Sequence, residues 1–293
     1  MTRVLVVGRR GQLARALAAT AWPAGWDVVF AGRETLDLGD LDALDRFLTE
    51  AAPEVVINTA AYTAVDRAEA EPELAFHLNA AAPERLARIC RASGTSLIQV
   101  STDYVFGATG TGPYSEDDAV GPVNVYGRSK AEGEGRVLAA NPDALIVRTA
   151  WLLSPGSGFI AAIAGQALHR RPLRVVADQH GNPTRASDLA EALVSLTGTR
   201  MAGGRASGVL HVAGPEFASW HEIAVAIMAS IDKGVAVSPV ATSDYATPAQ
   251  RPRDSRLNVA RLSSIHGMAL RPWSEWITET ARLGLIAAAN RVE

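Results

Sequence analysis

The sequence predicts an α/β fold in which a doubly wound parallel sheet carries a smaller C-terminal α/β lobe. Two observations predict it. Short runs of β-branched and aliphatic residues alternate with longer helical patterns over residues 1–212, which is typical of strand–helix–strand units around a parallel sheet. Beyond Gly214 this alternation loosens, so we expect the later segments to build the second lobe.

Each predicted strand is a short apolar run bounded by glycine, proline or polar residues. These runs lie at residues 4–7, 28–31, 55–57, 96–100, 144–147, 173–176 and 209–212. Apolar residues at helical spacing predict helices at 12–17, 40–51, 72–92, 123–140, 159–169, 187–196 and 218–231, and a last helix from Pro272. We expect Asp40 and Ser187 to cap their helices and Pro83 to interrupt the long one.

No linker or repeat divides the chain. We expect residues 1–150, with returning elements from about 173–212, to form one domain. Residues 151–293 would form mainly the second lobe, from insertions and the C-terminal segment.

The composition excludes several classes of protein. With 28 basic and 31 acidic residues, the net charge of -3 predicts no surface for nucleic acid. Cys90 is the only cysteine, so no disulfide can form within the chain. No apolar run approaches the ~18 residues of a membrane span, and no signal-peptide core follows the N-terminus. The histidines lack metal-ligand spacing. We therefore expect a cytoplasmic protein without a membrane segment or metal site.

The first predicted strand leads into a glycine turn, Gly8-x-x-Gly11-x-x-Ala14, and then into a helix. Glycines let the backbone approach a pyrophosphate that rests on the helix N-terminus, so this turn predicts a Rossmann-type dinucleotide site. Arg33 follows the second strand, where an arginine suits the 2'-phosphate of NADP better than the ribose of NAD. Asp37 is a candidate partner of the adenine amino group. An ordinary tight turn and solvent-exposed arginines remain the alternatives.

Two side chains in the helix predicted at 123–140 are spaced for acid–base chemistry. Tyr126 and Lys130 lie at i and i+4, on one helical face. An ammonium beside a phenol favours the phenolate and lowers its pKa toward neutrality. Thr102 follows the strand at 96–100, at the sheet edge where open α/β folds bind ligands. The three side chains predict a proton relay for carbonyl reduction; the alternative is a helical surface pair.

A polar stretch near the C-terminus, residues 247–258, combines three arginines with two prolines. Guanidinium groups on a proline-stiffened loop suit a diphosphate. A solvated loop is the alternative.

Seven motifs together resemble the extended short-chain dehydrogenase/reductases over nearly the whole chain. They are Gly8-x-x-Gly11-Gln12-Leu13, Asn58-Thr59-Ala60-Ala61-Tyr62-Thr63-Ala64-Val65-Asp66, Ser101-Thr102-Asp103-Tyr104-Val105-Phe106, Asn124-Val125-Tyr126-Gly127-x-x-Lys130, Arg148-Thr149-x-Trp151, Asp178-Gln179-x-Gly181-x-Pro183-Thr184 and Arg251-Pro252-x-x-Ser255-Arg256-Leu257. Within that superfamily they are similar to the branch that reduces the C4 keto group of dTDP-4-dehydro-L-rhamnose with NADPH or NADH.

The resemblance implies roles for particular residues. Tyr126 would give its proton to the C4 oxygen, Thr102 would hold that oxygen, and Lys130 would bind the nicotinamide ribose. Asp103 and Trp151 would line the sugar pocket, and Arg251 and Arg256 would face the diphosphate of the dTDP-sugar. The cofactor would be surrounded by Gly8, Gly11, Gln12, Leu13, Arg33, Asp37, Leu38, Ala60, Ala61, Tyr62, Thr63, Tyr126 and Lys130.

The sequence also departs from related branches. Sugar-nucleotide 4,6-dehydratases carry an Asp-Glu pair after the threonine, whereas Tyr104 follows Asp103 here. Some relatives dimerise through a magnesium site with a glutamate on the first helix, and residues 13–17 contain no carboxylate. We therefore expect no dehydratase, no metal-bridged dimer, and a monomer or weak homodimer. A non-catalytic NADP-binding subunit and a nucleotide-sugar epimerase stay open as alternative functions.

Overall fold

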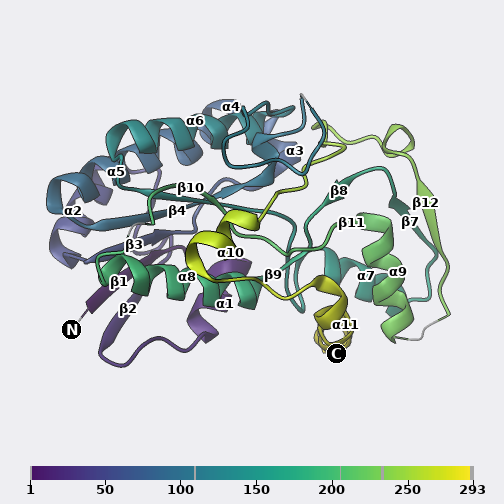
Figure 1. Ribbon diagram of the computed structural model, residues 1–293. Helices are drawn as coiled ribbons and strands as arrows, with labels where there is room; N and C mark the ends of the chain where they lie inside the picture. Colours follow the sequence, from purple (N-terminus) through teal and green to yellow (C-terminus); the bar gives the residue numbers. More distant parts are fainter. Residues whose placement is uncertain (1, 109, 205, 232–233, 291–293) are drawn as a thin grey trace.

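The computed structural model describes residues 2–108, 110–204, 206–231 and 234–290. Within these ranges the central sheet has six parallel strands in the order β10-β5-β4-β3-β1-β2 (Figure 1). Their bounds are β1 Thr2–Val7, β2 Trp26–Ala31, β3 Val55–Asn58, β4 Ser96–Thr102, β5 Leu145–Thr149 and β10 Gly208–His211. The predicted α/β class with a parallel sheet is confirmed.

Helices cover both faces of this sheet because its strands are apolar on both sides. In β1, Val4 and Val6 face α1 (Gln12–Ala19) and α8 (Ala186–Met201), whereas Leu5 and Val7 belong to the opposite core. That second core is covered by α2 (Leu41–Ala51), α5 (Ala82–Ser93) and α6 (Val125–Ala140). Each fully buried aliphatic side chain contributes about 1.5–3 kcal/mol to the stability of the fold. The two cores therefore hold the strands in place, and with them the carboxyl edge of the sheet.

The predicted interruption of the long helix is found beside Pro83, the Asp40 cap is confirmed, and the Ser187 cap is wrong. The chain from 72 to 93 runs through α4 (Pro72–Phe76), a π-helical turn η1 (His77–Ala81) and α5. The π-helical turn ends just before Pro83, which has no N–H to donate to the helix ladder. Ala81 and Ala82 both have α-helical dihedrals, so the helical segment continues through this junction. Ser187 is not a cap, because α8 begins at Ala186 and no side chain caps it. Asp40 does cap α2, accepting from Ala43 N at 2.9 Å.

The second lobe has its own apolar core. It is formed by α7 (Gly158–Leu168), α9 (Trp220–Ile231) and α11 (Trp273–Ala289), which pack around the buried Trp276. These helices lie together beside the end of the central sheet (Figure 1). The predicted strand β7 (Leu173–Val176) pairs with β12 (Val237–Val240) and not with the central sheet. Of the returning segment, α8 and β10 lie with the central sheet.

Short strand pairs and loops join the two lobes. β6 (Leu152–Leu153) pairs with β9 (Thr184–Arg185), and β8 (His180–Gly181) pairs with β11 (Ala218–Ser219). The helix predicted from Ala218 therefore begins two residues later. The remaining short elements are α3 (Val65–Ala68), η2 (Asp103–Val105), η3 (Thr242–Asp244) and α10 (Ala260–His266). No helix within the described ranges is long and apolar enough to cross a membrane.

Candidate active site and dinucleotide cleft

Two adjoining cavities follow the carboxyl edge of the central sheet. One, of about 350 Å³, lies between the ends of β1 and β2. The other, of about 460 Å³, lies between the start of α1, the end of β4 and helix α6. Arg10 and Ala61 line both cavities, so the two are parts of one cleft.

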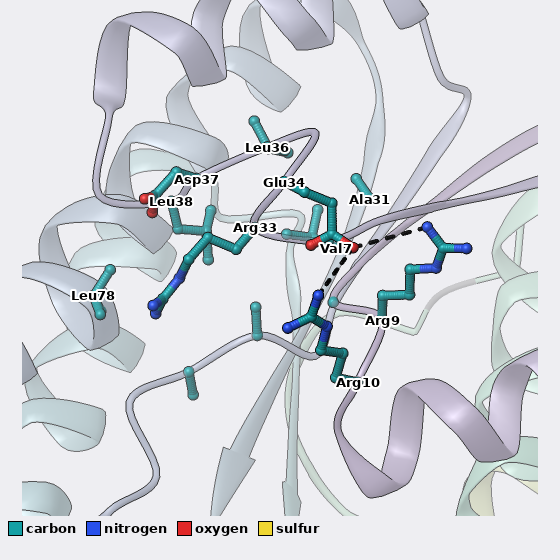
Figure 2. Close-up of a pocket in the computed structure, with 14 residues that line it drawn as sticks. Val7, Arg9, Arg10, Ala31, Arg33, Glu34, Leu36, Asp37, Leu38 and Leu78 are labelled. Carbon is teal, nitrogen blue, oxygen red and sulfur yellow. Dashed lines mark ion pairs between the residues drawn. The ribbon is translucent and has the colours of Figure 1, made fainter.

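The β1–β2 cavity is lined by most of the residues predicted for the adenosine end. Gly8, Arg33, Asp37, Leu38 and Ala60 all line it. Figure 2 shows Arg33 extending toward Leu78, on the far side of the cavity from Arg9 and Arg10.

Glu34 is the carboxyl group of this cavity that pairs with guanidiniums. Its carboxylate lies 3.9 Å from Arg9 Nη1 and 3.6 Å from Arg10 Nη2, as the dashed lines in Figure 2 mark. A hydrogen bond from its own backbone N–H, with help from the two arginines, lowers the pKa of Glu34. The cavity therefore holds three guanidiniums and the carboxyl groups of Glu34 and Asp37 beside the glycine turn.

The turn after β1 has the geometry that a pyrophosphate requires. Gly8 has φ +118°, and a Cβ there would lie 2.4 Å from Thr59 Oγ1, so a side chain would meet both strain and a clash. Helix α1 begins at Gln12 with no side-chain cap on its first N–H groups. Uncapped N–H groups and the positive end of a helix dipole favour an anion. The residues present therefore fit a dinucleotide diphosphate.

The second cavity brings Thr102, Tyr126 and Lys130 together, with Gln12 and Trp151 also in its lining. Gly11, Leu13, Ala61, Thr63 and Asp103 line it as well. Over the described residues, Ser101 Oγ and Thr149 Oγ1 are buried here without a hydrogen-bond partner. Buried hydroxyls without partners are costly, so this cavity suits a ligand rich in hydroxyl groups, such as a ribose or a sugar.

Three contacts fix the start of helix α6 and thereby place Tyr126. Asn124 caps the helix by accepting from Gly127 N at 2.7 Å, and Glu69 Oε1 accepts from Val125 N at 2.8 Å. Gly127 itself packs on the carbonyl of Tyr104, where a Cβ would lie 2.2 Å from the oxygen. Only glycine allows this approach, which brings the helix against the segment that follows β4.

A hydrogen-bonded chain of hydroxyl and carboxyl groups runs from Thr102 through Asp103 to Ser255, and its first two residues line the same cavity as Tyr126. Thr102 Oγ1 donates to Asp103 Oδ1 at 3.0 Å and accepts from Tyr104 N at 3.2 Å. Ser255 Oγ donates to the other carboxylate oxygen, Oδ2, at 2.6 Å. Asp103 is only 2% exposed. Burial raises the pKa of Asp103 to about 7, against the opposing effect of the hydrogen bonds from Ser255 and Thr102.

The predicted effect of Lys130 on Tyr126 is wrong for this structure. Lys130 Nζ donates to the carbonyl of Val100 at 2.8 Å, and burial lowers the pKa of Lys130 to about 8. Burial raises the pKa of Tyr126 to about 12, and the nearby Thr102 hydroxyl offsets this only in part. Desolvation of the phenolate therefore outweighs any attraction to the ammonium one helical turn away.

Comparison with known proteins identifies the family. A sequence model of the RmlD substrate binding domain matches residues 1–284. The dTDP-4-dehydrorhamnose reductase of Mycolicibacterium smegmatis is 41% identical over 277 residues, which cover 93% of this chain and 83% of that protein. The chain belongs to the dTDP-4-dehydrorhamnose reductase family.

Solved structures of other dTDP-4-dehydrorhamnose reductases have the same fold. The crystal structure from Clostridium acetobutylicum has a TM-score of 0.90 and 35% identity, and covers 96% of this chain and 99% of that one. The structure from Bacillus anthracis, which is a complex with NADP, has a TM-score of 0.88 and 31% identity at the same coverage.

In this member of the reductase family, Trp151 forms one wall of the second cavity. Its ring stacks on Trp220 with centroids 3.8 Å apart and an interplanar angle of 6°. The Trp151 backbone has φ +39°, which is uncommon for a bulky residue. The stack connects the cleft to α9 of the second lobe.

Two arginines of the arginine-rich loop, Arg251 and Arg256, have different surroundings. Arg251 lines a third cavity of about 800 Å³ between the lobes, together with Asp66 and Trp220. Arg251 Nη2 donates to Asp66 Oδ2 at 2.8 Å. Arg256 lines none of the three cavities, because Asp254 and the carbonyl of Gly112 hold its guanidinium.

Some contacts around the cleft differ from the sequence prediction or were not part of it. Tyr62, predicted to contact the cofactor, lines none of the cavities; its backbone is held by Asn79 through bonds of 2.8 and 3.0 Å. The same Asn79 also donates to Ser129 Oγ on α6 at 2.9 Å. Asp66 and Ser255 belong to two of the motifs, but the sequence alone assigns neither a role, because their partners Arg251 and Asp103 lie far away in the chain. Among the described residues no group of three acidic, histidine or cysteine side chains could hold a metal ion.

Proposed function

We propose that this protein reduces the C4 keto group of dTDP-4-dehydro-L-rhamnose to give dTDP-L-rhamnose, the last step of dTDP-rhamnose synthesis. The observation that carries the proposal is the meeting of Thr102, Tyr126 and Lys130 in one cavity of a cleft that fits a dinucleotide. Membership of the dTDP-4-dehydrorhamnose reductase family supports both the reaction and the substrate.

The cofactor that fits this cleft is NADPH, with NADH as the second choice. The adenosine end offers Arg9, Arg10 and Arg33 to a 2'-phosphate, and a relative from Bacillus anthracis binds NADP. Bound NADPH supplies the hydride for C4. Lys130 and the unpartnered hydroxyls of Ser101 and Thr149 would hold the sugar hydroxyls at the nicotinamide end.

The substrate would bind between the dinucleotide cleft and the second lobe. In this proposal the Tyr126 hydroxyl gives its proton to the C4 oxygen, and Thr102 holds that oxygen in place. Trp151 lines the sugar pocket, and Arg251 binds the diphosphate. The dTDP group would occupy the cavity of about 800 Å³ that Trp220 and Arg251 line. Arg256, held by Asp254, would support the loop and not the ligand.

The decisive experiment mixes the purified protein with NADPH and freshly prepared dTDP-4-dehydro-L-rhamnose and follows absorbance at 340 nm. We expect absorbance to fall until the limiting reactant is consumed, and dTDP-L-rhamnose to appear. NADPH that binds without being consumed at any pH would favour a non-catalytic subunit. Tightly held NAD and turnover without added reductant would favour an epimerase.

Two further features belong to the proposal. We expect a cytoplasmic enzyme, because charged nucleotide sugars and NADPH do not cross membranes unaided. We also expect a monomer or a weak homodimer. Light scattering with and without a chelator measures the mass and any dependence on metal.

A further inference from the structure

Asp103 is a buried carboxyl group beside the reacting groups. It follows the end of β4 directly and is 2% exposed. Each oxygen of its carboxylate accepts one hydrogen bond, Oδ1 from Thr102 Oγ1 at 3.0 Å and Oδ2 from Ser255 Oγ at 2.6 Å. Among the described residues it takes part in no ion pair of 4.0 Å or less with a Lys, Arg or His side chain. A carboxylate buried without a cation is destabilised relative to the neutral acid, and this outweighs the two hydrogen bonds that favour the ionised form.

The proposed reaction consumes one proton in each turnover. At C4, a new C–H bond takes its hydrogen and electron pair from the dihydronicotinamide. At the C4 oxygen, a new O–H bond takes its proton from Tyr126 and leaves a phenolate. That phenolate must regain a proton before the next turnover. Lys130 Nζ donates to the Val100 carbonyl and not to the phenol, whereas the Thr102 hydroxyl lies close enough to lower the pKa of Tyr126.

We propose that Asp103 supplies the proton that restores Tyr126, through the hydroxyl of Thr102. This inference rests on the proposed reductase function. When Asp103 is protonated, the bond between Asp103 Oδ1 and Thr102 Oγ1 reverses: the acid donates, and the Thr102 hydroxyl is free to turn to Tyr126. The phenolate then takes the Thr102 hydroxyl proton, and the Thr102 oxygen takes the proton of the Asp103 carboxylic acid in the same movement. Asp103 is left as a carboxylate and regains a proton from water. Ser255, on the arginine-rich loop, stabilises that carboxylate through its hydrogen bond.

Among the titratable groups named below, Asp103 is the one whose pKa lies nearest to neutrality. Tyr104, on the same turn, and Tyr126, on α6, both have pKa values raised by burial. Lys130, on α6, lines the same cavity and keeps its proton to a pKa of about 8. From the second lobe, Ser255 faces the carboxylate directly, and Arg251 with its partner Asp66 faces Tyr104. With a pKa raised to about 7, Asp103 exchanges protons readily at working pH.

The first test compares the wild type with Asp103→Asn. Asparagine keeps the shape and can still accept from Thr102, but it has no acidic proton. Because Tyr126 starts protonated, we expect a burst of one equivalent of NADPH oxidation per site at nearly the wild-type rate. Steady-state turnover should then be lower by about 10-fold or more. Equal losses in the burst and the steady state, or no loss in either, would overturn the proposal.

The pH dependence provides the second test. The supply of protons from Asp103 fails as the carboxyl ionises, so steady-state kcat of the wild type should fall as pH rises through about 7. Asp103→Asn should lack this limb. Ser255→Ala removes a hydrogen bond that lowers the pKa of Asp103, so the limb should move to higher pH. Ser263→Ala, on the exposed side of α10, is the matched control and should keep the wild-type profile.

A readout without turnover separates this inference from the proposed function. The carboxyl ¹³C signal that disappears in Asp103→Asn reports the titration of Asp103 directly. We expect a midpoint far above that of an ordinary aspartate, and a higher one in Ser255→Ala. An ordinary midpoint, or a Ser255→Ala limb that stays in place, would overturn the proton supply even if the wild type is a good reductase. A wild type that consumes no NADPH would instead overturn the proposed function.

Discussion

The two ends of the dinucleotide cleft use charge in opposite ways. At the adenosine end, the side chains of Arg9, Arg10 and Glu34 are 61%, 85% and 44% exposed, and their ion pairs are long. At the catalytic end, Asp103 and Lys130 are 2% and 4% exposed, and burial raises the pKa of Asp103 to about 7 and lowers the pKa of Lys130 to about 8. Exposed pairs are screened and contribute little, whereas buried charges are costly to leave unpaired.

This difference predicts where a single substitution has a large effect. A change of charge behind or within the catalytic end should alter stability or turnover strongly. The same kind of change at the adenosine end should alter only the preference for NADPH over NADH. The experiments below test this contrast, starting with the largest expected effect.

Glu134→Gln should give the largest effect. Glu134 lies one turn beyond Lys130 on α6 and accepts three hydrogen bonds from Arg148, at 3.0, 3.1 and 2.7 Å. Their side chains are only 7% and 5% exposed. Removal of the carboxylate leaves a buried guanidinium unpaired, which costs about 3–5 kcal/mol in the free energy of unfolding. Urea denaturation measures it.

Glu279→Gln is the matched control, because Glu279 pairs with Arg185 but is 62% exposed. Its loss should change the free energy of unfolding by less than about 1 kcal/mol. Equal effects of the two substitutions would remove the contrast between buried and exposed charge.

Tyr126→Phe should come second. It deletes the proposed proton donor and keeps the ring that packs edge-on against Tyr104 with centroids 5.8 Å apart. We expect kcat to fall by at least ~10², with NADPH affinity nearly unchanged in a fluorescence titration. Unchanged turnover would mean that another group protonates the product.

Arg33→Asp should have a smaller effect. It replaces an exposed guanidinium that suits a 2'-phosphate by a carboxylate that suits a ribose hydroxyl. We expect the ratio of kcat/KM for NADPH over NADH to fall by about 10-fold, with kcat at saturation kept. If the ratio stays constant, Arg9 and Arg10 carry the 2'-phosphate contact instead.

Glu34→Gln should have the smallest effect and the opposite sign. The Glu34 carboxylate occupies Arg9 and Arg10 and would repel a 2'-phosphate. Its neutralisation should raise the NADPH preference by about 2- to 5-fold at low salt, and the gain should vanish near ~1 M salt. Glu50→Gln, an exposed change on α2, should leave the ratio unaltered. A gain that survives high salt would show a buried contact at this end.

The sheet and the core of the catalytic cavity were predictable from local patterns. Val4 to Val7 and the glycine turn after it specify a strand and a helix N-terminus within a few residues. Tyr126 and Lys130 share a helical face for the same local reason. Thr102 could be placed beside them because parallel strands end at one edge.

What sequence reasoning missed depends on contacts across long stretches of chain. Asp103 meets Ser255 and Asp66 meets Arg251 only after the second lobe folds back onto the first. The sign of the Tyr126 shift was wrong, because burial of a hydroxyl cannot be read from spacing along a helix. The pairing of β7 with β12 could not be predicted for a similar reason, because a short apolar run shows that a strand forms but not which strand it pairs with.

The π-helical turn His77–Ala81 gives the long helical segment one residue more than an unbroken α-helix would need. Asn79 lies in that turn, and its one amide group grips both the loop after β3 and helix α6. Deletion of a single residue here would rotate the preceding helix by about 100° and swing the amide away from both partners. The extra residue of the π-helical turn thus couples two parts of the site. Through Asn79, the loop after β3 and helix α6, which carries Tyr126, are held in a fixed position relative to each other.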